Sequence, residues 1–362
     1  MERISVHQFA VVCIGVTLGF TFLPIGQAAA GVAGRDAWMA VVPAFAAGIP
    51  FGLMVLSLAR RYPGQNFLQI YEQLAGKWVA KAVGLLYILI TIYFCSLLLQ
   101  LSIDTFKRSI LPLVPESVFL ASMILVFFLV WTGMEVFARF AEVVLPLSVI
   151  SLLFILVFSL PRFEWDEFWP LLEEGIMPVA LATVKLSAMP MEFILFQLIL
   201  LPFLPQGETA RLRTGIWRGM LFVGILNGLI TLTENMVFGP EETARINYGT
   251  LILGKMVEIS KTVAGVESVF MITLMGVEIL KIGAFVFAAA EGLAYLTGFT
   301  KRGWLYTGVI VLCSGLAMAE HGGTWLYLET GMVQSYLVEP LAIGLVLVLW
   351  LLAHWRRGRA AG

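Results

Sequence analysis

A hydrophobic stretch near the start of the chain, IGVTLGFTFLP from Ile14 to Pro24, has the composition of a membrane helix that breaks in its middle. Its glycines supply flexible backbone, and Pro24 removes one helical hydrogen bond upstream of itself. A second interrupted stretch, KLSAMPME from Lys185 to Glu192, follows five hydrophobic segments later. Interrupted spans at matching places in two halves of a membrane protein indicate a ligand site.

The composition places the chain in a membrane. Of its 362 residues 60% are hydrophobic and 13% are charged, and the mean hydropathy is +0.92. Soluble domains carry roughly 25% charged residues, so this chain has too few to cover a water-facing surface. The net charge of −1 gives no indication of a nucleic-acid partner. Cys13, Cys95 and Cys313 lie in apolar segments, which favours free thiols over disulfides or a metal cluster.

Ten stretches approach the length of about 20 apolar residues that a helix needs to cross a bilayer. They are 7–29, 36–59, 79–101, 116–132, 138–160, 177–204, 215–239, 267–297, 303–319 and 331–355. We expect a single transmembrane domain over 1–362, with a first repeat at about 7–160 and a second at about 177–355. Because five spans is an odd number, two such halves must enter the membrane in opposite directions, as an inverted repeat.

In inverted-repeat folds the first helix of each half is discontinuous, and its freed backbone groups face a ligand near the bilayer midplane. The N-terminus of a half-helix has a positive partial charge, so an anionic group such as an amino acid carboxylate is the expected guest. Gly15 and Gly19 also form a GxxxG pattern, and helix packing is the alternative for this helix taken alone.

Lys and Arg residues orient the chain, because they accumulate in cytoplasmic loops. With a cytoplasmic N-terminus, fourteen of the 23 fall inside, seven fall outside, and Lys185 and Lys281 lie within the membrane. Both termini are therefore expected in the cytoplasm. The seven external residues are Arg35, Lys107, Arg108, Arg162, Arg245, Lys255 and Lys261.

Two loops are predicted to contain helices. Residues 64–76 carry apolar side chains at helical spacing, which predicts an amphipathic helix on the cytoplasmic surface, with an ordinary loop as the alternative. The external stretch 246–259 is also helix-like and could cover an outward-facing cavity or pack against a partner. The apolar residues are Phe67, Leu68, Ile70, Tyr71 and Leu74 in the first loop, and Leu251, Ile252, Met256, Val257 and Ile259 in the second.

Ionisable residues within the spans are candidate functional groups, because each costs about 2.5–3.5 kcal/mol near the bilayer centre. Glu278 and Lys281 are three residues apart and can pair. Lys281 could neutralise a carboxylate, replace a coupling sodium ion or form a proton relay with Glu278, and a buried structural pair is the alternative. Glu192 follows the second break, where a carboxylate favours the positive end of the next helix segment. Glu234 and Asn227 share a helix face, so they line a polar path or bond to a neighbouring helix.

Tyr93 and Leu97 share a face of the third span with Gln100, which predicts a wall of the site or an ordinary core stripe. The expected ligand contacts are Gly15, Thr17, Leu18, Gly19, Tyr93, Leu97, Ser187, Ala188, Met191 and Lys281, with Glu192, Glu234 and Glu278 as coupling or relay residues. The sequence contains no HExxH, GxSxG or Gly-rich phosphate loop. We therefore expect no catalysis, metal or cofactor.

Several short motifs, in their order and spacing over essentially the whole chain, resemble the B subunits of spore germination receptors. These belong to the amino acid-polyamine-organocation superfamily. The motifs are ISVHQF at 4–9, the break at 15–24, GRDAW at 34–38, LAGK at 74–77, MPME at 189–192 and GVE at 265–267, with Lys281 following.

The resemblance implies an all-α fold of ten transmembrane helices with a LeuT-like 5+5 inverted repeat and discontinuous helices 1 and 6. It also implies a protein of the spore inner membrane that binds a small nutrient, often an amino acid, and triggers germination together with an A-type membrane subunit and a C-type lipoprotein subunit. Some transporters of the superfamily have a lysine in span five, and none lies between Arg139 and Arg162 here. Their coupling mechanism is therefore not transferred, and Lys281 is a hypothetical substitute.

Two other functions are compatible with the sequence. A proton- or sodium-coupled amino acid transporter would share the fold and the pocket, so sequence alone separates it poorly from a receptor. A structural assembly subunit with a vestigial pocket is the third hypothesis.

Overall fold

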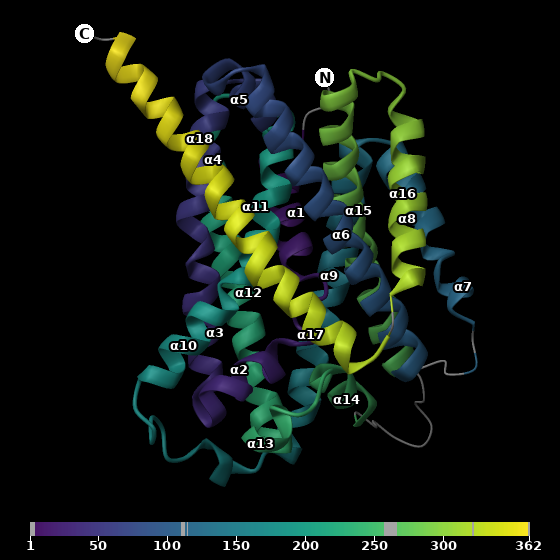
Figure 1. Ribbon diagram of the computed structural model, residues 1–362. Helices are drawn as coiled ribbons and strands as arrows, with labels where there is room; N and C mark the ends of the chain where they lie inside the picture. Colours follow the sequence, from purple (N-terminus) through teal and green to yellow (C-terminus); the bar gives the residue numbers. More distant parts are fainter. Residues whose placement is uncertain (1–3, 110–112, 114, 257–265, 321, 361–362) are drawn as a thin grey trace.

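The computed structural model describes residues 4–109, 113, 115–256, 266–320 and 322–360, and every regular element in these ranges is helical (Figure 1). The first half contains α1 (Val6–Leu18), α2 (Ile25–Ala33), α3 (Ala37–Ala46), α4 (Gly48–Arg61), α5 (Phe67–Ala75), α6 (Lys77–Ser109), α7 (Glu116–Phe119), α8 (Ser122–Trp131) and α9 (Met134–Ser159). The second half contains α10 (Met177–Leu186), α11 (Ala188–Leu200), α12 (Thr209–Phe238), α13 (Pro240–Thr243), α14 (Gly249–Met256), α15 (Val266–Thr297), α16 (Arg302–Ala319), α17 (Thr324–Val333), the π-helical turn η5 (Gln334–Val338) and α18 (Glu339–Ala360). Four short 3-10 turns complete the described elements: η1 (Gly34–Asp36), η2 (Leu160–Arg162), η3 (Trp165–Phe168) and η4 (Leu201–Phe203).

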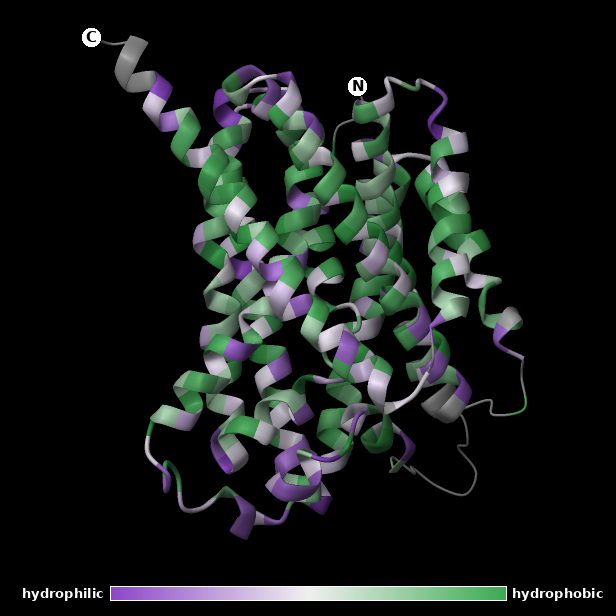
Figure 2. Ribbon diagram, viewed as in Figure 1, coloured by the Kyte–Doolittle hydropathy of each residue, from purple (hydrophilic) through white to green (hydrophobic). Residues whose placement is uncertain are grey.

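All ten predicted spans fall on helices, which confirms a multi-pass membrane protein. Within the described residues, eight helical stretches are long and apolar enough to cross a bilayer, and Val6–Leu18 and Ser122–Trp131 are shorter apolar helices. The difference from ten arises because the first predicted span is divided between α1 and α2, and the fourth is divided between α7 and the ten residues of α8. Hydrophobic residues fill the middle of the bundle, and hydrophilic residues are concentrated at its two ends (Figure 2).

The first predicted break is present. Helix α1 ends at Leu18, and the chain runs through residues 19–24 before α2 begins at Ile25. Phe20 has a φ of +64°, a left-handed conformation that is unfavourable for a bulky residue. Pro24, directly before α2, has no N–H group to donate to the carbonyl oxygen of Phe20, so the sequence itself favours a break that ends here.

The second predicted break is present and short. Only Ser187 separates α10 from α11, with φ and ψ of −63° and −17°, and its N–H group still donates to the carbonyl oxygen of Thr183 at 3.1 Å. Pro190 lies in the first turn of α11, where a backbone N–H has no intrahelical acceptor and its loss costs little. The discontinuity predicted for the sixth span is therefore confirmed, and it is limited to one residue.

The helix α15 lies at the centre of the packing. It contacts α6 on one side and α9, α1 and α16 on others, and almost all of its described side chains are buried. The start of α1, the end of α18 and α5 lie at one end of the bundle, and α13 and α14 lie at the other (Figure 1). The break between α1 and α2 therefore lies inside the bundle, between its two ends.

The two predicted loop helices are present. All five apolar residues predicted for 64–76 are buried on α5, which begins with a capping box between Asn66 and Gln69. In the second stretch, 246–259, α14 buries Leu251 and leaves Ile252 partly exposed. Val257 and Ile259 lie outside the described residues, as does Gly265 of the GVE motif.

Candidate functional site

Threonine hydroxyl groups stabilise the end of α1. Thr17 donates to the carbonyl oxygen of Cys13 at 2.7 Å, and Thr21 donates to that of Thr17 at 2.6 Å. The last carbonyl groups of a helix have no intrahelical donor, so the Thr21 hydroxyl satisfies a group that the break leaves free. The Thr21 oxygen also lies 3.4 Å from the Nζ atom of Lys281 on α15.

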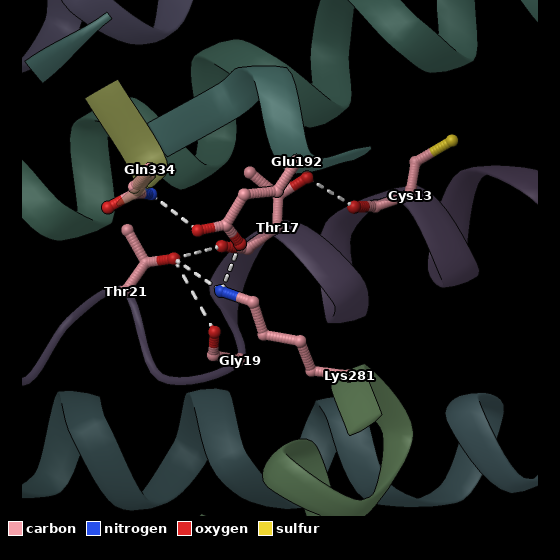
Figure 3. Close-up of polar contacts among 7 residues, drawn as sticks. All are labelled: Cys13, Thr17, Gly19, Thr21, Glu192, Lys281 and Gln334. Atoms are coloured by element: carbon pink, nitrogen blue, oxygen red, sulfur yellow. Dashed lines mark hydrogen bonds and ion pairs between the residues drawn. The ribbon is translucent and has the colours of Figure 1, made fainter. Parts of the chain in front are cut away.

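Lys281 forms an ion pair with Glu192 on α11, and both side chains are only 2% exposed. Gln334, in the π-helical turn η5, donates a hydrogen bond to the other carboxylate oxygen of Glu192. Figure 3 shows the Lys281 ammonium and the Gln334 amide directed at the same carboxylate, with Thr21 beside the ammonium. We call these four residues the central cluster. It connects the break in the first span to three further elements, α11, α15 and η5.

The central cluster identifies the partner of Lys281. Its partner is Glu192, and Glu278 accepts a hydrogen bond from Ser102 on α6 instead. A buried charge is tolerated only when it is paired and hydrogen-bonded, and the cluster supplies both conditions. Thr21 and Gln334 are not among the residues predicted for the site, although Thr21 lies within the predicted break. A polar amide near the start of the tenth span was the available signal.

Glycines allow α1 to lie directly against α15. A Cβ atom at Gly19 would lie 2.7 Å from the carbonyl oxygen of Val277 and 2.9 Å from the Cβ atom of Lys281. A Cβ atom at Gly15 would collide with the side chain of Leu280. Thr17 and Leu18 are buried as well. Of the predicted backbone contacts of the ligand, Gly15 and Gly19 are therefore covered by α15.

A second set of polar contacts, around the Glu234 carboxylate, lies next to the end of the break that leads into α2. The hydroxyl oxygen of Thr250 on α14 lies 2.7 Å from the Glu234 carboxylate on α12 and 2.9 Å from the carbonyl oxygen of Phe22. A Cβ atom at Gly249 would lie 2.6 Å from the Cδ atom of Glu234, and one at Gly26 on α2 would collide with the carboxylate. Glu234 is 1% exposed, so it connects α12, α14 and the break.

We expect Gly26→Ala to destabilise the protein by about 1–3 kcal/mol, because its methyl group overlaps the Glu234 carboxylate. Combining it with Glu234→Ala should remove part of that penalty, and denaturation of the two single variants and the double variant measures the coupling. Gly31→Ala on the same helix is the control, since a Cβ atom there meets no atom within 4 Å. Strictly additive effects would contradict the contact.

The remaining predicted contacts lie in different surroundings. Ala188 and Met191 are buried on α11 beside the central cluster, and Ser187 donates to Glu339 at the start of α18, with a distance of 2.8 Å. The Tyr93 hydroxyl group donates to Glu329 on α17 at 2.6 Å, and Leu97 is fully buried. Both are on α6, which packs mainly against α15 and α16. Asn227 is buried and donates to the carbonyl oxygen of Val223 within α12.

A cavity of about 460 Å³ lies at the end of the bundle that carries α5. Its lining includes Asn66 at the start of α5, Phe287 and Glu291 on α15, and Arg302 and Tyr306 on α16. None of the predicted ligand contacts lines this cavity.

A family model described as "Spore germination protein" matches residues 3–320 of the chain. Spore germination protein KB of Bacillus subtilis (strain 168) is 24% identical over 372 aligned positions, which cover 99% of this chain and 96% of that protein. Spore germination protein YndE of the same strain is 22% identical over 205 positions. That alignment spans 56% of this chain and about half, 55%, of YndE.

Among solved structures, that of MhsT in complex with L-phenylalanine superimposes with a TM-score of 0.71 at 14% sequence identity. The match covers 95% of this chain and 88% of MhsT. At this identity the similarity establishes the fold, which is LeuT-like as predicted.

Proposed function

Because this chain belongs to the family of spore germination proteins, we propose that it is the nutrient-binding membrane subunit of a germinant receptor. In this function it binds a small molecule, an amino acid in our proposal, and the resulting conformational change triggers germination. The proposed partners are an A-type membrane subunit and a C-type lipoprotein subunit. The proposed location is the spore inner membrane with both termini in the cytoplasm. The fourteen-to-seven distribution of Lys and Arg and the position of α1 and α18 at one end support this orientation.

The central cluster is the observation that carries the proposal. Lys281 and Glu192 place one positive and one negative charge beside the break, inside the bundle. A zwitterionic amino acid carries the complementary pair, so its carboxylate can bind Lys281 and its ammonium group can bind Glu192. Each charge-assisted hydrogen bond contributes about 1.5–3 kcal/mol. A ligand that makes both bonds replaces the internal ion pair without leaving either buried charge unpaired.

This exchange explains how binding could be transmitted. Glu192 is bonded to η5, and Lys281 lies beside Thr21 of the break, so separating the two side chains changes contacts on four elements at once. A ligand shifts a conformational equilibrium only by its differential affinity for the two states. In this proposal the ligand has a higher affinity for the state in which Lys281 and Glu192 are separated, because it then neutralises both charges in place of the internal ion pair.

A binding titration tests this function. The purified protein in lipid nanodiscs should bind at least one amino acid from a panel that also contains sugars and nucleosides. Removing either the carboxylate or the ammonium group of that amino acid should weaken binding by about tenfold or more, since about 1.4 kcal/mol corresponds to a factor of ten. Binding that tolerates both removals would contradict the role of the central cluster, and silence across the panel would contradict the nutrient-binding function.

An amino acid transporter is the second candidate, because the LeuT-like fold is shared with MhsT. Purified protein reconstituted into liposomes separates the two functions. Uptake driven by an imposed proton or sodium gradient would favour the transporter, and saturable binding without uptake would favour the receptor.

A further inference from the structure

A carboxylate occurs near the middle of a span at the surface of the bundle. The last apolar stretch runs from Trp325 to Arg356. At a rise of 1.5 Å per residue, Glu339 lies about 20 Å along the helix from Trp325 and about 25 Å from Arg356. Its side chain is only partly buried. Within the described residues its hydrogen-bond partner is Ser187, which donates to one of the two carboxylate oxygens.

The surroundings of Glu339 are apolar and exposed. On α10, Met177, Leu181 and Val184 precede Ser187 at helical spacing, and they are 66%, 56% and 70% exposed. On the other side Tyr336, three residues before Glu339, is 75% exposed. The Ser187–Glu339 hydrogen bond thus lies between the exposed row on α10 and the exposed side chain of Tyr336. We call this surface, on α10 and at the junction of η5 with α18, the α10–α18 face.

Lipid tails can cover these exposed side chains, but they cannot donate a hydrogen bond to the Glu339 carboxylate. A polar group at this depth is stable only when protein or a water-filled cavity supplies its partners. We propose that the α10–α18 face binds a transmembrane helix of a partner protein, and that this helix places a Lys, Arg, Asn or Gln side chain against Glu339. A donor of this kind satisfies the free carboxylate oxygen, and small and apolar residues next to it pack against Val184 and Tyr336.

The α10–α18 face adjoins the central cluster. Gln334, which donates to Glu192, is in the same π-helical turn as Tyr336, and Ser187 lies four residues before Met191. A helix docked here touches the elements that hold the Lys281–Glu192 ion pair. This docking surface rests on one part of the proposed function, which is that the chain assembles with a partner protein in the membrane.

Photocrosslinking in the native membrane tests the docking surface. The photoreactive residue p-benzoylphenylalanine is placed at Tyr336 of the full-length chain. The matched control position is Ile150 on α9, which is 63% exposed; α9 packs mainly against α15 and α1. We expect a specific adduct at Tyr336 and none at Ile150. Peptide mapping should locate the adduct in a transmembrane helix of a different protein with a Lys, Arg, Asn or Gln near mid-span. Glu339→Leu should reduce the adduct about tenfold, while Glu339→Gln, which still accepts from Ser187, should reduce it less.

Four outcomes would overturn the proposal. An adduct with a second copy of this chain would make the face a self-association surface. An adduct that Glu339→Leu leaves undiminished, or no adduct from protein that is present at normal levels, would remove the role of the carboxylate. Labelling of Glu339→Cys by a membrane-impermeant thiol reagent would show that the position faces water; the three native cysteines are buried and give little background. Amino acid binding by the purified subunit needs no partner, so each proposal can fail independently.

Discussion

Lys281→Met should abolish the nutrient response and lower the stability of the protein by about 3–5 kcal/mol, the usual consequence of removing one partner of a buried ion pair. Methionine has nearly the shape of the lysine side chain, so packing against α1 is retained while the positive charge is lost. Glu192 then remains as an uncompensated buried carboxylate, held only by Gln334. Thermal unfolding in detergent measures stability, and germination or ligand titration measures the response.

A double variant separates the structural role of the pair from its role in binding. Lys281→Met combined with Glu192→Gln has no charge in the central cluster, and its glutamine can still accept a hydrogen bond from Gln334. We expect it to regain most of the lost stability, because an uncharged replacement of a buried pair is often neutral or stabilising. It should nevertheless bind the amino acid at least about tenfold more weakly than the wild type. Full recovery of binding would mean that the pair is purely structural.

Gly19→Ala should disrupt the break even though it adds a single methyl group. The new carbon would lie 2.7 Å from a backbone carbonyl oxygen of α15, which cannot move without shifting the helix, and 2.9 Å from the Cβ atom of Lys281. We expect a loss of about 1–3 kcal/mol from overpacking and a strongly reduced nutrient response, because α1 and the lysine are forced apart. Unfolding and dose-response measurements on the same membrane preparation record both effects.

Gly31→Ala is the matched control for this substitution. Gly31 is on α2, downstream of the break, and a Cβ atom there meets nothing within 4 Å. Alanine is a better helix former than glycine by roughly 0.5–1 kcal/mol, so this variant should be unchanged or slightly more stable. Equal losses in Gly19→Ala and Gly31→Ala would show that chain flexibility, and not close packing on α15, explains the glycines of this region.

Residue chemistry predicts the two breaks with different success. Between Gly19 and Pro24 the local sequence favours a break, because glycine is a poor helix former and Pro24 cannot donate a helical hydrogen bond. The left-handed conformation of Phe20 is a feature of the folded structure. Around Ser187 the same residue types produce only a slight interruption, because Pro190 occupies a first turn that tolerates it. The sequence shows that a proline is present, and the register of the helix determines its effect.

For the charged residues, too, the sequence shows their presence and the tertiary structure determines their partners. Their presence inside membrane spans marks Glu192, Glu234, Glu278 and Lys281 as unusual from the sequence alone. Their partners are not local. Lys281 bonds to Glu192 and not to its neighbour Glu278, and Glu234 lies against glycines of two other helices. Spacing along one helix gives no information about which side chains of other helices come within hydrogen-bond distance.

The sequence by itself determined the membrane class, the positions of the spans, the helix on the surface at α5 and the break after Leu18. These depend on hydropathy, periodicity and backbone chemistry, which act over a few neighbouring residues. Only the tertiary structure decided that Gln334 completes the central cluster, that α15 covers Gly15 and Gly19, and that Glu339 lies on the surface of the bundle. These facts depend on how distant helices are rotated and packed against one another, and a contact of that kind exists only once the whole bundle has formed.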